Sequence, residues 1–160
     1  MSAEPVEASC SRTLFIISVG ENAISEKFLT VKKKFAHDIG VQVVEKNFDK
    51  INTEEIVQEI GSIAQNDNCG IIVQLPLPKH LETRAIVNAI LPTHDVDVLS
   101  EESFKLYEDG HLDILPPVIG AIKEILFRHN VFVGNKNVVI VGKGKLVGEP
   151  AAIWFERHQS

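Results

Sequence analysis

Two kinds of hydrophobic pattern alternate along this chain. Residues 13–19 and 70–73 form apolar runs, as expected of strands that are buried on both faces of a parallel sheet. Residues 41–44 predict a further short strand, and residues 137–141 predict a fourth. The segments between these runs carry apolar residues at helical spacing instead. This alternation predicts an α/β fold with a parallel sheet.

The first helical segment has the clearest stripe. Five apolar residues spaced three or four apart predict a helix over residues 23–39, and Gly40 offers a C-cap. The next helix begins at Thr53, which is followed by two glutamates in the first turn. The stripe consists of Ile24, Phe28, Val31, Phe35 and Ile39. Further helices or helical turns are predicted over residues 81–90, over 101–107, after the Pro116-Pro117 pair and over 146–155.

The Pro116-Pro117 pair divides the chain into a longer and a shorter part. Three strand–helix units come before it, whereas one strand and one helix follow it. A dinucleotide-binding half-domain needs about three strands in a βαβαβ arrangement. We therefore expect a first domain over residues 12–115. Residues 116–160 would form a linker helix and the first βα unit of an incomplete dinucleotide-binding domain.

Composition narrows the class of protein. With 44% hydrophobic and 24% charged residues, the 160-residue chain has the composition of an ordinary soluble protein. Its net charge of −6, without a basic patch, argues against nucleic acid as a partner. No apolar run approaches the roughly 18 residues that cross a membrane. Cys10 and Cys69 lack metal-ligand spacing, so we expect reduced thiols, no metal site and a cytoplasmic location.

One polar side chain follows the strand predicted at residues 70–73. The strand runs into Gln74, and Pro76 and Pro78 then end the pairing because proline offers no N–H to a sheet. Open α/β sheets bind ligands at the carboxyl ends of their strands. Gln74 is therefore a candidate site residue, placed just ahead of a rigid loop.

Two charged motifs have both a functional and an ordinary interpretation. Lys32 lies one turn after Phe28, on the rim of the predicted stripe, where its amine could point into a cleft and transfer protons. The ordinary alternative is that the three lysines at residues 32–34 form a solvated charge run. Asp95 and Asp97 share a face if their segment is extended, and they could serve acid–base chemistry or hold the N–H groups of a heterocycle. Their ordinary alternative is an acidic loop.

A glycine-rich turn links the strand predicted at residues 137–141 to the following helix. Its glycines are spaced two and four apart, one residue wider than the usual dinucleotide fingerprint. Glycines let the backbone approach a pyrophosphate, and lysines could face a 2′-phosphate, so the turn predicts a dinucleotide cofactor but does not decide between NADP and NAD. A tight turn with solvated lysines is the ordinary interpretation. The turn comprises Gly142, Lys143, Gly144, Lys145, Leu146, Val147 and Gly148.

Taken in order, these segments resemble the bifunctional methylenetetrahydrofolate dehydrogenase/methenyltetrahydrofolate cyclohydrolase family, the FolD type. The likeness covers about residues 13–158, and residues 73–78 carry its most specific part, the signature V-Q-L-P-L-P. Residues 19–32 are similar to V-G-x-x-x-A-S-x-x-Y-x-x-x-K, residues 95–97 to D-V-D, Pro116 to the start of P-C-T-P, and residues 142–150 to G-R-S-x-I-V-G-x-P.

The resemblance implies two activities, which are the NADP-dependent oxidation of 5,10-methylenetetrahydrofolate and the hydrolysis of 5,10-methenyltetrahydrofolate to 10-formyltetrahydrofolate. It implies that Lys32 is the acid–base residue of the hydrolysis, hydrogen-bonded to Gln74, and that Asp97 accepts the pterin's N–H groups. The nicotinamide cofactor would bind at residues 142–148, the folate would lie between two domains, and family members are usually homodimers. Residues that the resemblance places on the substrate are Ser25, Phe28, Leu75 and Pro76.

The chain departs from the family pattern at four places. Phe28 replaces a tyrosine that stacks on the folate, and Val98 stands where a glycine follows D-V-D. Pro117-Val118 replace C-T, and Lys143-Gly144 replace Arg-Ser, which turns a bidentate phosphate contact into a point charge. The chain lacks the family's N-terminal helix and everything after the first dinucleotide-binding helix, so we expect weak or no dehydrogenase activity.

Two alternatives stay open on the sequence. One is a non-catalytic folate-binding or dimerisation module descended from the enzyme. The other is a different two-domain dehydrogenase, acting on an amino acid or on shikimate.

Overall fold

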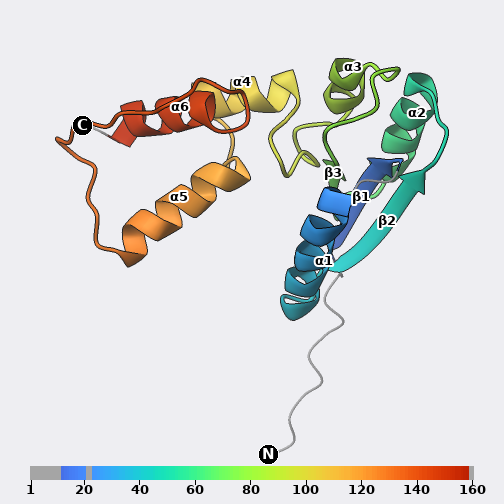
Figure 1. The fold of residues 1–160 in the computed structure, drawn as a ribbon, viewed down its shortest axis with the longest axis horizontal. Helices are drawn as coiled ribbons and strands as arrows, with labels where there is room; N and C mark the ends of the chain where they lie inside the picture. The colour runs from blue at the N-terminus through green and yellow to red at the C-terminus, as the bar shows by residue number, and fades with distance from the viewer. Residues whose placement is uncertain (1–11, 21–22, 159–160) are drawn as a thin grey trace, which may run out of the picture. The chain divides into compact units, whose positions relative to one another are not determined.

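A computed structural model describes residues 12–20 and 23–158 of the chain. It contains two compact units, of which the first ends at Asp95 and the second begins at Val96 (Figure 1). The division into domains expected at the Pro116-Pro117 pair stays a prediction. No described helix has the length and apolar character needed to cross a membrane.

The first unit is built on a three-stranded parallel sheet. Strands β1 (Thr13–Val19), β2 (Gln42–Phe48) and β3 (Cys69–Val73) lie in the order β2-β1-β3, so β1 is central. Residue Ile16 of β1 aligns with Glu45 of β2 and with Ile72 of β3. The three parallel strands expected from the sequence are confirmed, and β2 continues past the four residues that predicted it.

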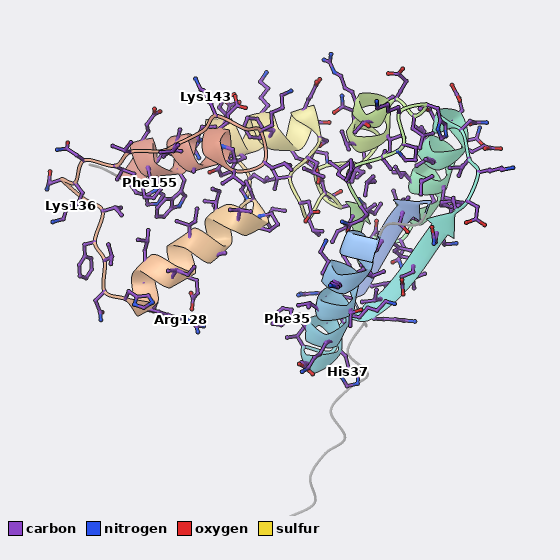
Figure 2. All side chains as sticks on the ribbon, in the orientation of Figure 1. Phe35, His37, Arg128, Lys136, Lys143 and Phe155 are labelled. Atoms are coloured by element: carbon purple, nitrogen blue, oxygen red, sulfur yellow. The ribbon has the colours of Figure 1, made fainter. Side chains whose placement is uncertain are left out.

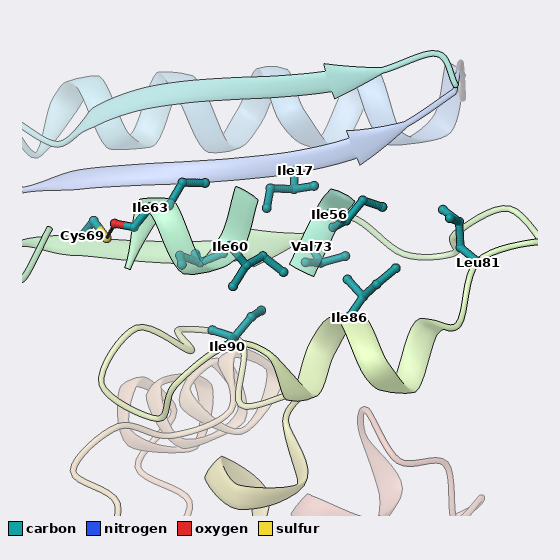
Figure 3. Packing of buried hydrophobic residues seen from close by; sticks show 10 residues of the cluster. Ile17, Ile56, Ile60, Ile63, Cys69, Val73, Leu81, Ile86 and Ile90 are labelled. Carbon is teal, nitrogen blue, oxygen red and sulfur yellow. Dashed lines mark hydrogen bonds between the residues drawn. The ribbon is translucent and has the colours of Figure 1, made fainter. Parts of the chain in front are cut away.

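The core of the first unit lies between the sheet and helices α2 (Thr53–Ile63) and α3 (Thr83–Asn88). The helix α2 begins at a complete capping box, in which Asn52 Oδ1 accepts the N–H of Glu55 and the Glu55 carboxylate accepts the N–H of Asn52. Figure 3 shows side chains of β1, β3, α2 and α3 meeting in one cluster. The fully buried members of this cluster include Ile17, Ile56, Ile60, Ile71 and Ile86.

Cys69 is a free thiol at the start of β3, within this core. Its Sγ lies 3.5 Å from the carbonyl oxygen of Ile63. Burial raises the pKa of the thiol above its ordinary value, and the nearby charge of Asp67 raises it further. The thiol is therefore protonated and poorly nucleophilic near neutral pH, which agrees with a reduced cysteine. Cys10 lies outside the described residues.

Helix α1 (Ala23–Asp38) forms where the stripe predicted it, and Gly40 follows it with a positive φ of 72°. A stripe of this kind is ordinarily the buried face of a helix, but the members whose side chains are described do not follow this rule. Val31, Phe35 and Ile39 are 67%, 64% and 57% exposed, whereas Ala36 is buried. A sheet of three strands is narrow, and it covers one face of α1 rather than the whole apolar arc. Phe35 projects outward from the helix (Figure 2).

The second unit consists of helices α4 (Glu101–Asp109), α5 (Pro117–Arg128) and α6 (Gly148–His158) with the segments that join them. Its small core contains Ile119, Ala151 and Trp154 from α5 and α6. Helix α4 begins at Ser100, whose hydroxyl accepts the N–H of Ser103.

The strand expected at residues 137–141 is wrong. The structure shows neither strand nor helix there, and Val139 and Val141 are 85% and 97% exposed. A parallel strand forms only when neighbouring strands accept its hydrogen bonds. Within the described part of the second unit no other strand is present to pair with this segment.

Tyr107 ties α4 to α6 in the second unit. Its buried hydroxyl donates a hydrogen bond of 2.8 Å to the carbonyl oxygen of Pro150, and the Arg157 guanidinium lies 5.6 Å from the centre of its ring. Burial raises the pKa of Tyr107 above its ordinary value, and the Arg157 charge offsets part of that rise.

We expect the second unit to lose stability in alkaline solution as Tyr107 ionises. Because the pKa is raised on folding, its stabilising contribution is complete below the ordinary value of about 10 and is lost as the pH rises through the folded-state value. Tyr107 is the only tyrosine in the chain, so the absorbance of the phenolate reports this residue alone. The native protein should develop that absorbance at a higher pH than the urea-unfolded chain. Coincident titration curves would contradict the prediction, and Tyr107→Phe serves as the blank.

Candidate functional site

Gln74 occupies the carboxyl end of β3. Its N–H donates a hydrogen bond of 2.8 Å to the carbonyl oxygen of Ile17, which continues the ladder between β1 and β3. Side chains alternate between the two faces of a strand. Val73 points into the core against α2, so Gln74 projects from the opposite face of the sheet, as Ile72 does.

The side-chain oxygen of Gln74 has an unusual environment. Gln74 Oε1 is buried, and it has no hydrogen-bond partner among the residues that the structure describes. Nearly all buried polar atoms in folded proteins are hydrogen-bonded, because an unsatisfied one costs about 1–3 kcal/mol. A buried acceptor without a partner therefore marks a place where a donor from a ligand or a mobile side chain can bind.

Helix α1 lies on the same face of the sheet as Gln74. Its Lys33 forms an ion pair with Glu45 of β2, which is in register with Ile16 and Ile72 on that face. Lys32 is half-buried and lies one turn before the buried Ala36, so it belongs to the side of α1 that approaches the sheet. This position supports a functional role for Lys32 over a fully solvated lysine run.

Lys32 and Gln74 thus occupy one face of the first unit, and they carry complementary groups. A lysine ammonium has three donors and no acceptor, whereas Gln74 Oε1 is an acceptor that lacks a donor. The structure shows no hydrogen bond between the two side chains among its described residues. Their direct contact therefore stays a prediction.

The loop after Gln74 is anchored at two points to the start of α2. His80 Nε2 lies 3.4 Å from the carbonyl oxygen of Ile51, and the N–H of Glu82 donates to Thr53 Oγ1 at 3.0 Å. Leu75 and Leu77 pack against the core, and the Leu75–Pro76 peptide bond is cis. Pro76 is exposed, as a residue that meets a substrate would be. The sequence gives no sign of either anchor, because contacts between residues 29 positions apart leave no local pattern.

The segment that contains the two aspartates differs from the sequence expectation. Only Asp95 pairs with the sheet, through a single parallel bridge to Ile71, and residues 96 and 97 form a turn. The expectation that Asp95 and Asp97 share one face of an extended strand is therefore wrong. Val98, which follows the turn, adopts a left-handed conformation. Asp95 is buried in the first unit, whereas Asp97 is half-exposed at the start of the second.

Val98 has a φ of 55°, which a β-branched residue rarely adopts. Its side chain is buried, so both Val98→Ala and Val98→Gly lose apolar contacts. Only glycine relieves the strain, and we expect Val98→Gly to be more stable than Val98→Ala by about 1 kcal/mol. Urea unfolding followed by circular dichroism tests this order. A helical position serves as the control and should show the opposite order of glycine and alanine. In helix α5, replacing the exposed Ala121 with glycine should lower the stability by about 1 kcal/mol.

The glycine-rich turn leads directly into α6, as the sequence predicts. Gly142 has a φ of 101°, in the region that favours glycine. A Cβ atom on Gly148 would lie 2.2 Å from the carbonyl oxygen of Gly142, so only glycine fits where the turn closes. Lys143, Lys145 and the 47% exposed Val147 reach the solvent.

The turn fits the phosphate part of a dinucleotide only partly. Its glycines and exposed lysines suit an anion, and the positive end of α6 adds to the attraction. The N–H groups of Glu149 and Ala151 already donate to Gly144 and Val147, at 3.1 and 2.9 Å, and Pro150 has no N–H. Few amide donors at the start of α6 are thus left for a phosphate, which predicts weak binding.

Two of the substrate residues expected from the sequence are only partly described. Ser25 and Phe28 belong to α1, but their side chains lie outside the described part of the structure. Both precede Lys32 on the same helix, by two and by one helical turn respectively. Their roles therefore stay predictions.

Comparison with known proteins adds a family context to this geometry. The model of the family described as "Tetrahydrofolate dehydrogenase/cyclohydrolase, catalytic domain" matches residues 2–97. The "Bifunctional protein FolD" of Lactobacillus gasseri is 33% identical over 148 residues, which cover 91% of this chain and 52% of that protein. The chain thus spans about half the length of the relatives that it matches.

Two solved structures are similar to the chain in fold. The bifunctional FolD enzyme, a methylenetetrahydrofolate dehydrogenase/cyclohydrolase from Campylobacter jejuni, superposes with a TM-score of 0.88 at 25% identity, covering 94% of this chain and 54% of that one. The corresponding enzyme of Trypanosoma brucei, solved with NADP cofactor and an inhibitor, has a TM-score of 0.85 at 25% identity, covering 93% of this chain and 52% of that one.

Proposed function

The chain belongs to the tetrahydrofolate dehydrogenase/cyclohydrolase family, and we propose that it acts in one-carbon folate metabolism. Its primary reaction would be the hydrolysis of 5,10-methenyltetrahydrofolate to 10-formyltetrahydrofolate. The observation that carries this proposal is the buried, unpartnered Gln74 Oε1 on the face of the sheet that α1 covers with Lys32. This family membership favours a folate substrate over the amino acid or shikimate of the alternative dehydrogenase.

The chemistry needs a group that can move protons beside an electrophilic carbon. Water adds to the methenyl carbon and loses a proton, and the carbon–nitrogen bond to N5 then breaks as N5 gains a proton. A lysine amine can accept the first proton and return one to N5. In this scheme Gln74 Oε1 accepts a hydrogen bond from Lys32 and holds the amine in place. Leu75 and Pro76 line the substrate site together with Ser25 and Phe28.

Recognition of the pterin would come from Asp97. A carboxylate can accept hydrogen bonds from an amino group and a ring N–H at once. We propose that residues 12–115 bind the folate, with Asp97 supplied by the turn that Val98 closes. The alternative of an acidic loop with no ligand predicts that an Asp97→Asn variant binds folates as well as the unchanged chain.

The oxidation of 5,10-methylenetetrahydrofolate is the second proposed activity, with residues 116–160 contributing the cofactor site. NADP, or NAD in its place, accepts a hydride from the methylene carbon when bound. Lys143, Lys145 and the glycines of the turn would contact its phosphates. The unpaired segment at residues 137–141 and the occupied amides at the start of α6 support weak dehydrogenase activity at most.

A non-catalytic folate-binding or dimerisation module remains the second candidate. The absence of a paired strand in the described part of the second unit favours it, since such a unit gives the cofactor little support. We further propose a homodimer and a cytoplasmic location.

Two measurements on the unchanged chain test the proposed function. The decay of methenyltetrahydrofolate absorbance, compared with buffer alone, measures hydrolysis, and isothermal titration calorimetry with a folate analogue measures binding. Hydrolysis above the buffer rate supports the enzyme. Binding without hydrolysis supports the module. If the chain showed neither hydrolysis nor binding, both proposals would be contradicted.

A further inference from the structure

Two hydrogen bonds of the first unit fix the two ends of the loop at residues 75–82. At its start, the N–H of Gln74 donates to the carbonyl oxygen of Ile17 at 2.8 Å. At its end, the N–H of Glu82 donates to Thr53 Oγ1 at 3.0 Å. The first bond belongs to the backbone ladder of the sheet, whereas the second depends on one side chain of α2. The two ends of the loop can therefore be loosened separately.

The hydroxyl of Thr53 is available to the loop because its own helix does not use it. Thr53 is the first residue of α2, and the capping box already closes this end of the helix. Its side chain is half-buried and accepts the Glu82 N–H instead. His80 makes the other anchor, but it is exposed, and its Nε2 lies 3.4 Å from the carbonyl oxygen of Ile51, near the limit for a hydrogen bond. Thr53 thus makes the stronger of the two anchors.

We propose that Thr53 is a positioning residue, which holds Leu75 and Pro76 in place for the substrate by fixing the far end of their loop. This role rests on the proposed function, in which these two residues line the folate site. Leu81 also holds the loop, because its side chain is buried in the core. Apolar burial has no preferred direction, whereas a hydrogen bond fixes the orientation of the backbone. Loss of the Thr53 hydroxyl therefore lets the loop move while the core stays packed.

The position of this anchor separates substrate affinity from the rate of proton transfer. Gln74 keeps its place without Thr53, because the sheet holds its backbone, and Lys32 belongs to α1. The residues that contact the substrate lose a support, whereas the groups that move protons do not. A loss of binding that is equal in the ground state and the transition state raises KM and leaves kcat unchanged.

Kinetics and calorimetry test this separation. Thr53→Val keeps the shape of the side chain but removes the acceptor. It should raise the KM for 5,10-methenyltetrahydrofolate about two- to tenfold, the factor that corresponds to one net hydrogen bond, and leave kcat unchanged. The Kd of 5-formyltetrahydrofolate, a stable isomer of the proposed product, should rise by the same factor. Thr53→Ser keeps the hydroxyl and should restore both constants. Ser62→Ala removes an exposed hydroxyl at the other end of α2 and is the matched control.

Hydrogen exchange without any folate tests the anchor itself. Thr53→Val should speed the exchange of the amides in the loop, whereas Thr53→Ser and Ser62→Ala should not. The amides of β1 are the internal reference, because a general loss of stability would speed their exchange as well. The anchor is overturned if Thr53→Val leaves the loop amides unchanged. It is equally overturned if the loop and β1 amides respond alike.

Further outcomes distinguish this inference from the proposed function. A chain that binds 5-formyltetrahydrofolate equally well before and after Thr53→Val overturns the inference alone, and so does a variant that loses kcat but keeps KM. If the chain binds the probe without hydrolysing the substrate, the Kd decides. An unchanged chain that binds no folate overturns the proposed function, and the positioning role of Thr53 with it.

Discussion

Replacing Lys32 with alanine should lower the rate of methenyltetrahydrofolate hydrolysis by at least about 100-fold, because proton transfer by a positioned side chain contributes about 10²- to 10⁴-fold. Lys32 is half-buried on the side of α1 that approaches the sheet, where alanine removes the amine and leaves the helix intact. The rate of absorbance decay at saturating substrate measures the effect.

Lys33→Ala is the matched control for this experiment. Lys33 is the next residue on α1, but it is more exposed and forms an ion pair with Glu45. Such surface pairs contribute about 0–1 kcal/mol, so the control should fold and keep its hydrolysis rate. Equal rates for Lys32→Ala and the unchanged chain would remove Lys32 from the mechanism. Equal losses in both variants would point to damage of α1 rather than lost acid–base chemistry.

Replacing Gly148 with alanine should destabilise the second unit by about 2 kcal/mol or more. The new Cβ would lie 2.2 Å from the Gly142 carbonyl oxygen and 3.0 Å from the Lys143 Cα. Both are backbone atoms and cannot move aside as a flexible side chain would. The turn must open, and the start of α6 must shift with it.

Urea unfolding followed by tryptophan fluorescence measures this loss. Trp154 is the only tryptophan of the chain and lies buried in α6, so its emission reports the second unit alone. Gly120→Ala in α5 is the control, because no heavy atom beyond its chain neighbours and the backbone of its own helix lies within 4 Å of its new Cβ. Alanine favours a helix over glycine, and this control should gain up to about 1 kcal/mol. If Gly148→Ala were as stable as Gly120→Ala, the close packing of the turn would be contradicted.

The sequence alone was sufficient to predict the elements whose signals are local. An apolar run bounded by polar residues defined β1, and Asn52 with Glu55 closes a capping box at the start of α2, where Thr53 and its glutamates had predicted a helix. The V-Q-L-P-L-P motif likewise placed Gln74 at the end of a strand. These features depend on residues a few positions apart, so a pattern in the chain contains them.

Interactions between distant residues decided the rest. Residues 137–141 have the composition of a strand, but pairing needs a neighbouring strand, and the described part of the second unit has none. The apolar stripe of α1 predicted a buried face, but the width of the sheet determined that Ala36 is buried and Phe35 is exposed. Residues 96 and 97, which were expected to be extended, form a turn, and Val98 follows it in a left-handed conformation.

The candidate site shows the same division. The sequence determined which polar groups stand at the strand end and on the helix, because motif and spacing name Gln74 and Lys32 directly. Only the tertiary structure decided that both belong to one face of the sheet and that Gln74 Oε1 is buried without a partner. Burial and hydrogen bonding depend on what packs around an atom, and that surrounding comes from segments far apart in the chain.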